Sequence, residues 1–176
     1  MIEDKVFCVK INTKGKNPFN FCLGRDIVGI GWGLKHGNPN TIDEYERLRG
    51  DNNEKFGNDA SLSRALNIFK ELENGGLIWT ISPDNEYYLC KTNGKYTYHG
   101  NEEEHIKADI INCLDSEFYK IGPATIVPDE VIKNLNDKKC PTATTICDKR
   151  AVSSTFEIYN LICQKSKINS RNKVVN

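Results

Sequence analysis

The chain has 176 residues, the length of one ordinary domain, and this is enough to bury a sizeable apolar core. Its 24 Lys and Arg residues balance its 24 Asp and Glu residues, so the formal net charge is zero; this excludes a histone-like polycation but not a local basic groove. No stretch approaches the ~20 apolar residues of a transmembrane helix, and the first residues lack the basic and apolar regions of a signal peptide. We therefore expect a cytoplasmic protein without membrane contact.

The first half of the chain predicts strands followed by helices. Alternating β-branched and aromatic residues predict a strand over residues 5–11, a turn-like stretch follows, and residues 26–32 predict a second strand that is rich in glycine. Thr41 and Glu44 have capping-box spacing at the start of a short helix. A longer helix over residues 60–74 is predicted from its apolar stripe, with Asp59 as its N-cap.

The second half predicts a strand meander and two further helices. The dipeptide Asn93-Gly94 is a strong hairpin-turn signal. The predicted strands are residues 77–82, 87–92, 95–99, 105–114 and 117–120, and the predicted helices are residues 128–135 and 154–163. This order favours an α+β fold in which a small, mostly antiparallel β-barrel carries helices on its outside, as a single domain over residues 1–163. Residues 164–176 hold four cations and no acid, and we predict a basic disordered tail there.

Seven cysteines suggest a metal site or disulfides, but their pattern argues against both. The number is odd, and no pair has the short separation of a zinc knuckle. Cys8, Cys90 and Cys113 lie within apolar runs, where a thiol behaves as a small hydrophobe. We expect buried thiols and neither a bound metal nor a cofactor.

Aromatic residues are the most informative candidates for a binding site. Trp32 stands at a strand end between glycines that would leave its ring exposed. Tyr96 and Tyr98 share one face of a predicted strand, because alternate residues of a strand point the same way. Rings that converge near a glycine-lined strand end could stack on a base, and each stacked base contributes about 1–3 kcal/mol.

The order of these features resembles the PUA-like superfamily, most closely its EVE-like and YTH-like modules, which read modified bases in modification-dependent restriction and defence proteins. The segments that carry the resemblance are residues 5–10, 26–33, 69–72, 76–82, 87–98 and 156–160. The resemblance implies a reader that accepts an extruded, modified or unmodified base of nucleic acid, with DNA favoured over RNA. It also implies a nuclease or NTPase partner, fused or separately encoded.

The resemblance and the residue types together suggest a role for each candidate. Trp32 would stack on the base, Tyr96 or Tyr98 would oppose it, and Asn12 would read a base edge. The predicted phosphate contacts are Lys10, Arg25, Lys35 and Lys95. Two departures from the family pattern are the acidic run at residues 102–104 and the zero net charge, which gives no long-range attraction to phosphate.

Two other functions remain open from the sequence. No nucleotide-binding loop, nucleophile elbow or zinc-protease motif is present, so we expect no enzyme. If the protein is nevertheless an enzyme acting on a nucleoside or RNA, the acid/base candidates are His99, His105 and Glu104. A protein-interaction module of the antitoxin or phage-regulator kind would explain the neutral charge, and an exposed apolar patch would then mark its site.

Overall fold

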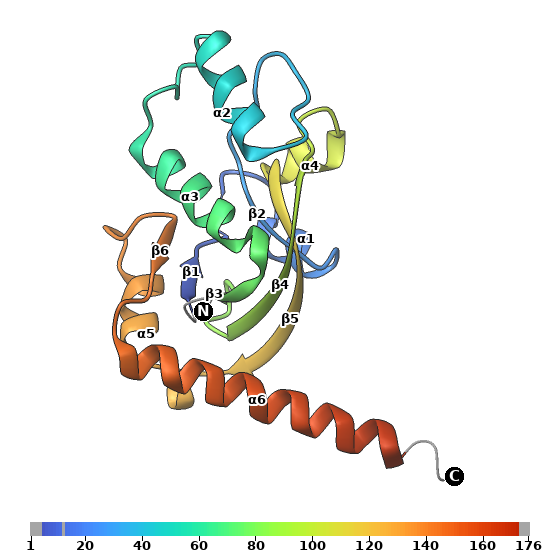
Figure 1. The fold of residues 1–176 in the computed structure, drawn as a ribbon, viewed down its shortest axis with the longest axis vertical. Helices are drawn as coiled ribbons and strands as arrows, with labels where there is room; N and C mark the ends of the chain where they lie inside the picture. Colours follow the sequence, from blue (N-terminus) through green and yellow to red (C-terminus); the bar gives the residue numbers. More distant parts are fainter. Residues whose placement is uncertain (1–4, 12, 173–176) are drawn as a thin grey trace.

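The computed structural model describes residues 5–11 and 13–172, and it shows an α+β fold built on a single sheet (Figure 1). The strands are β1 (Val6–Val9), β2 (Ile27–Ile30), β3 (Gly76–Ile81), β4 (Tyr87–Tyr98), β5 (Asn112–Gly122) and β6 (Ala143–Thr145). The α-helices are α1 (Pro18–Leu23), α2 (Ile42–Asp51), α3 (Ala60–Glu71), α4 (Glu103–Ala108), α5 (Asp129–Asn136) and α6 (Lys149–Asn172). Short 3-10 helices lie at Leu72–Asn74 and Ala124–Ile126.

The six strands form a mixed, open sheet in the order β2-β5-β4-β3-β1-β6. β1 pairs with β3 in parallel, and the other neighbouring pairs are antiparallel. The predicted small antiparallel barrel is therefore wrong. Closing a barrel requires the two edge strands to pair, whereas β2 and β6 stay at opposite edges among the described residues. Helices cover both faces, so each face packs its own core rather than enclosing a common interior.

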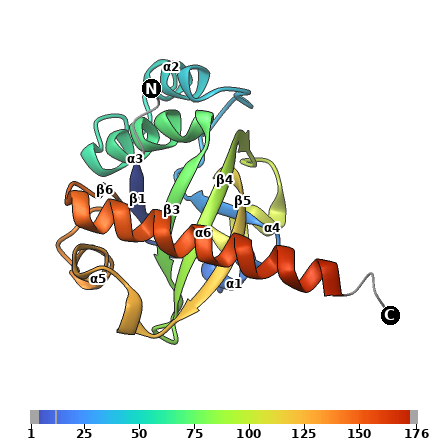
Figure 2. The same cartoon turned by 60° about the horizontal axis from the view of Figure 1, so that its bottom comes forward.

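Alternation along β1 shows how the two faces are filled. Phe7 and Val9 point into the core beneath α2 and α3, while Val6 and Cys8 point into the core beneath α5 and α6. This is the period-two pattern of a strand that is buried on both sides. Figure 2 shows α6 crossing the sheet on the side away from α3. The indole N–H of Trp79 on β3 donates to Thr155 Oγ1 of α6 at 2.9 Å and fixes this contact.

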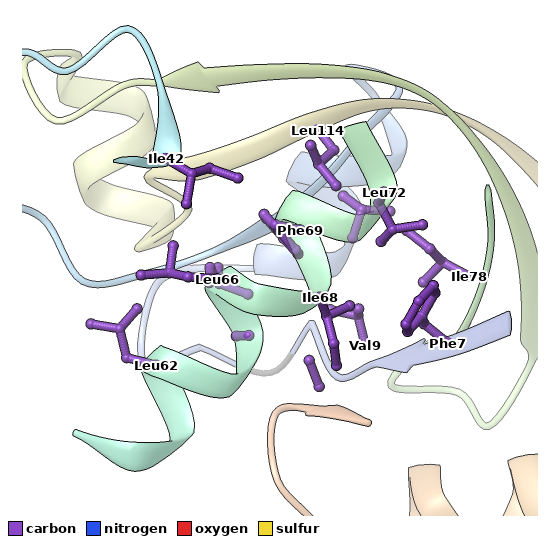
Figure 3. Close-up of a cluster of buried hydrophobic side chains, with 14 of the residues drawn as sticks. Phe7, Val9, Ile42, Leu62, Leu66, Ile68, Phe69, Leu72, Ile78 and Leu114 are labelled. Atoms are coloured by element: carbon purple, nitrogen blue, oxygen red, sulfur yellow. The ribbon is translucent and has the colours of Figure 1, made fainter. Parts of the chain in front are cut away.

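Helix α3 is the main support of its face and matches the sequence prediction. Asp59 Oδ1 accepts a hydrogen bond from Leu62 N at 2.9 Å, which confirms the predicted N-cap. Leu62, Leu66 and Phe69 are fully buried, and Figure 3 shows them in one cluster with Phe7 of β1. Burying each such side chain contributes about 1.5–3 kcal/mol, so this stripe anchors α3 to the sheet.

The Asn93-Gly94 dipeptide does not form the predicted hairpin turn. β4 runs through it as one strand, and its register with β5 shifts between Thr92 and Tyr96, which marks a β-bulge. Gly94 has φ of +85°, and a Cβ there would lie 2.1 Å from the carbonyl oxygen of Glu73. The glycine therefore allows the close approach of β4 to the 3-10 helix Leu72–Asn74 that follows α3, and it does not reverse the strand direction.

The segment after β4 also differs from the prediction. Residues 105–114 were expected to be one strand, but α4 occupies 103–108 and β5 begins at 112. The two acids at the start of α4 favour its N-terminus, and Glu103 pairs with Lys107 at 2.6 Å across one turn. Part of the expected turn-like stretch before β2 is likewise helical, as α1.

The last helix is longer than the sequence suggested. We predicted that it ends at residue 163 and that a disordered tail follows, but α6 continues to Asn172. Both views show its C-terminal part extending beyond the edge of the sheet (Figures 1 and 2). Within the part of the chain that the structure describes, no helix is both long and apolar enough to cross a bilayer.

Candidate functional site

The loops that follow β1 and β2 meet beside α3 and α4 to form a pocket of about 520 Å³. Pockets that hold small ligands usually measure about 300–1,000 Å³. The lining residues are Lys10, Thr13, Lys14, Gly31, Trp32, Gly33, Asp59, Asp109 and Thr142. The lining thus combines one tryptophan, two lysines, two aspartates and two threonines around a cavity whose size suits a nucleobase or a nucleoside.

Trp32 holds an unusual backbone conformation at this pocket. Its φ of +63° lies in the left-handed region, which costs an L-amino acid about 1–2 kcal/mol. Part of its side chain packs against the core beneath α3, and the rest stays accessible. A bulky residue in this conformation persists only where its surroundings hold it, and such residues cluster at binding sites.

Hydrogen bonds from three elements hold the backbone on either side of the tryptophan. The Tyr45 hydroxyl of α2 donates to the Trp32 carbonyl at 2.6 Å, and Asn112 Nδ2 of β5 donates to the Gly31 carbonyl at 2.6 Å. The Leu34 N–H donates to the hydroxyl oxygen of Tyr98 at 2.8 Å. Because these partners are largely buried, the conformation of residues 31–34 is built into the fold before any ligand arrives.

The two predicted pocket tyrosines support Trp32 instead of opposing its ring. The Tyr96 hydroxyl donates to Asn112 Oδ1 at 2.8 Å. This bond orients the Asn112 amide so that its Nδ2 group donates to the Gly31 carbonyl. Tyr98 bonds Leu34 as described above and is 7% exposed. Burial raises the pKa of both phenols, so they stay protonated at neutral pH. Of these described side chains, neither lines the pocket.

Lys10 lines this pocket and also a neighbouring hollow, to whose residues Asp137 and Cys140 its ammonium group is bonded. Its Nζ donates to the carbonyl oxygens of Asp137 at 2.5 Å and Cys140 at 2.9 Å, and the residue is 9% exposed. An ammonium group has three donors, so these two bonds orient the charge and leave donor capacity for a ligand. Lys14, which the sequence analysis did not select, adds an exposed ammonium to the same pocket.

Asp109 faces the two lysines from the end of α4. Partial burial raises the pKa of its carboxyl, and the backbone N–H and positive charge of Lys14 partly offset this rise. The carboxylate packs directly against β2, because a Cβ at Gly31 would lie 2.6 Å from Asp109 Oδ1. Asp109 therefore offers an acceptor in the same pocket as Trp32, next to Gly31. The other carboxylate, that of Asp59, is already engaged as the N-cap of α3.

The remaining predicted phosphate contacts lie away from this pocket. Arg25 pairs with Glu104 and stacks 3.9 Å above the centre of the Phe21 ring, near α1 and α4. The Lys35 backbone N–H donates to Glu54 Oε1 at 2.6 Å beside α2. Lys95 is exposed at the β4 bulge. Asn12 lies outside the described residues.

The histidines that were candidates for catalysis also lie elsewhere. His99 and His105 stack on one another beside Cys113, and the Nδ1 atom of His99 lies 2.5 Å from Glu102 Oε1. This is the histidine–carboxylate pairing that an acid/base enzyme would need. No residue of the pair lines the described pocket next to Trp32, so the pairing and the pocket are two separate features.

Comparison with known proteins finds neither a matching family model nor a matching curated relative for this chain. Any functional assignment therefore rests on the geometry of the sites.

Proposed function

We propose that this protein is a nucleic-acid reader that takes an extruded base, modified or unmodified, into the pocket beside Trp32. The observation that carries the proposal is the strained, pre-organised Trp32 at the wall of a nucleobase-sized cavity. A flat base can stack on the accessible part of the indole, and stacking contributes about 1–3 kcal/mol per base. Extruding a base costs a few kcal/mol, so further polar contacts are required.

Asp109, Lys10 and Lys14 can supply those contacts. An ionised carboxylate accepts hydrogen bonds from the exocyclic amino group or ring N–H of a base, so Asp109 is the candidate for reading its edge. The two ammonium groups can contact the sugar–phosphate backbone on either side of the extruded nucleotide. With zero net charge over the chain, affinity has to come from these local contacts and not from long-range attraction.

The biological setting is part of the same proposal. The resemblance to base-reading modules favours DNA over RNA and a restriction or defence context, with a nuclease or NTPase as partner. A cytoplasmic location agrees with the cysteines, since no disulfide joins any of them in the described part of the chain. The resemblance rests on short segments only, because the barrel of those modules is replaced here by an open sheet.

Binding to matched oligonucleotides tests the proposal. We expect the wild-type chain to shift oligonucleotides that carry a modified or unpaired base at low salt. Trp32→Ala should weaken binding about 5–150-fold, because one stacking contact of about 1–3 kcal/mol is lost. Tyr159→Ala on α6 is the matched aromatic control and should bind like the wild type. Absence of binding at low salt, or equal binding by Trp32→Ala, would overturn the proposal.

Tryptophan fluorescence supplies an independent readout. Trp79 is fully buried and bonded to Thr155, whereas Trp32 is partly accessible. A stacked base should therefore quench only the Trp32 emission, and the quenching should vanish in Trp32→Phe while binding is largely kept. Quenching that persists in this variant would place the ligand elsewhere on the molecule.

A further inference from the structure

A second group of chemically active side chains lies at the end of the sheet, apart from the Trp32 pocket. His99 follows β4, His105 belongs to α4 and Cys113 belongs to β5. One potential ligand atom from each residue lies within 4.8 Å of the other two. The side chain of His99 is 18% exposed, and His105 and Cys113 are buried. The topology thus brings two imidazoles and a thiol to one partly accessible point.

Hydrogen bonds leave each imidazole with one nitrogen available as a ligand. His105 Nδ1 lies 2.7 Å from the carbonyl oxygen of Ile110, which can only accept, so this nitrogen carries a proton. His99 Nδ1 lies 2.5 Å from the carboxylate of Glu102 and is protonated for the same reason. In a neutral imidazole the other nitrogen, Nε2, then has a free lone pair. Histidines that bind metals are usually held in this way by a carbonyl or carboxylate partner.

The charges near the cluster suit a divalent cation. Glu102 Oε2 also lies 3.8 Å from His105 Nε2, so one carboxylate stands beside both rings. A metal-bound Cys113 would be a thiolate, and its charge and that of Glu102 together would balance a 2+ ion. The rings of Phe21 and His105 pack edge to face with centroids 4.8 Å apart, so His105 has an apolar neighbour.

We propose that His99, His105 and Cys113 bind a zinc-type divalent cation, with water in the fourth position and Glu102 as the hydrogen-bond partner of His99. Two imidazoles and a thiolate favour zinc over magnesium or calcium, which prefer oxygen ligands. The two rings now stack with centroids 3.8 Å apart at 9°, and a metal cannot lie in the planes of two parallel rings at once. The more exposed His99 ring is the one that can tilt to complete the geometry. These three ligands are spaced irregularly along the chain, so they match none of the short zinc motifs that a sequence can reveal.

A metal bound at this site would stabilise the segment of residues 99–113, which contributes to the Trp32 pocket. Residues 99–113 contain Asp109, which lines that pocket, and Asn112, which holds the Gly31 carbonyl. A metal that links both ends of this segment to α4 would restrict its local opening. This stabilising role of the metal does not depend on which ligand binds in the Trp32 pocket.

Cobalt titration of the reduced, metal-free full-length protein tests the site. Cobalt(II) reports both geometry and ligand type, through the visible bands of a tetrahedral ion and a near-ultraviolet thiolate charge-transfer band. We expect one cobalt per chain with both signals, displaced by zinc. Cys113→Ser should abolish the charge-transfer band. Cys147→Ser, which removes an exposed thiol elsewhere, is the matched control and should leave the band intact.

Two further variants separate metal binding from packing. Glu102→Gln should weaken zinc affinity about 10–100-fold, as is typical for the hydrogen-bond partner of a histidine ligand. His99→Ala should weaken zinc binding strongly, and zinc should then no longer raise the melting temperature as it does in the wild type. A spectrum without tetrahedral bands, or a charge-transfer band that survives in Cys113→Ser, would overturn the proposal. Oligonucleotide binding is measured separately, so failure of either proposal leaves the other standing.

Discussion

At Trp32, backbone strain destabilises the folded state, whereas side-chain contacts stabilise it. The left-handed φ of +63° disfavours any residue that has a Cβ, while the indole ring gains from packing against the core beneath α3. Bonds from Tyr45 and Asn112 to the adjacent carbonyls keep the backbone in place. Trp32 therefore combines a strained backbone with an accessible ring, and substitutions at this position can measure the two effects separately.

Replacing the tryptophan by glycine or alanine measures that strain. Both variants lose the ring, but only glycine adopts a positive φ without penalty. We expect Trp32→Gly to be more stable than Trp32→Ala by about 0.5–1 kcal/mol, after allowing for the greater entropy of unfolded glycine. Urea denaturation of the two variants measures the difference. Equal stability would mean that the backbone relaxes once the ring is removed.

Asp109 makes the stability depend on pH. Partial burial raises the folded-state pKa of its carboxyl, so the folded protein binds the proton more tightly than the unfolded chain does. The contribution of this group is thus complete below its unfolded pKa and is lost as pH rises through the raised folded pKa. Asp109→Asn, which keeps the shape and tolerates the left-handed conformation, should remove this loss. We expect the variant to gain stability relative to wild type as the pH rises above about 3.9, the ordinary pKa of an unfolded aspartate, and to keep that gain at higher pH.

Thermal melts of the two proteins across that pH range provide the measurement. The gain should disappear at low pH, where Asp109 is protonated in both folded and unfolded states. The same variant should weaken oligonucleotide binding, because the amide presents only one acceptor oxygen where the carboxylate has two. A pH-independent difference in stability would show that the carboxylate is not desolvated.

At the scale of elements, the bulge in β4 joins the sheet to the helical layer. Thr92 Oγ1 accepts from the Gly94 N–H at 3.0 Å, and the Gly94 Cα approaches the end of α3 near Glu73. The bulge also redirects the strand so that Tyr96 reaches Asn112. A local irregularity in one strand thus contributes to the support of the Trp32 pocket.

Two glycine-to-alanine substitutions with opposite expected signs test this account. Gly94→Ala adds a Cβ at positive φ and 2.1 Å from the Glu73 carbonyl oxygen, so it should destabilise the fold by more than about 1–2 kcal/mol. Gly50→Ala lies in α2 with open space around its Cβ, and it should stabilise by about 0.5–1 kcal/mol. Chemical denaturation compares both with the wild type. A neutral Gly94→Ala would show that β4 can shift away from α3.

At the scale of the whole molecule, α6 closes one face of the sheet and then leaves it. Its packed apolar residues on that face, from Ala151 to Tyr159, belong to the first half of the helix. The C-terminal part extends past the sheet (Figure 1). Four cations and no acids occur in residues 164–176, so this segment adds positive charge without an opposing carboxylate.

Deleting residues 164–176 should separate stability from electrostatics. We expect little change in the free energy of unfolding, because the apolar contacts described for α6 involve residues before 160. If the protein binds nucleic acid, the deletion should weaken binding to modified and unmodified oligonucleotides equally. It should also flatten the salt dependence by up to four contacts at about 0.7–0.9 log units each. An unchanged salt slope, or loss of folding, would contradict this.

The sequence by itself determined the features that depend on neighbours along the chain. The Asp59 cap, the apolar stripe of α3 and the strands β1 to β3 follow from residue type and short-range spacing, and all are present. Trp32 could be selected because it stands between glycines at a strand end, and Lys10 because its place after the first strand matches ligand-contacting positions of the family that the sequence resembles. The structure brings both to one pocket.

Only the tertiary structure decided which elements meet. Whether the sheet closes depends on β1 pairing in parallel with β3 and on β6 taking the far edge, and no spacing rule encodes that choice. Asn93-Gly94 forms a bulge where the 3-10 helix Leu72–Asn74 lies against it, and Asp109 lines the Trp32 pocket next to Gly31. These outcomes are set by contacts between residues far apart in the chain, whose energies exceed local turn and strand preferences.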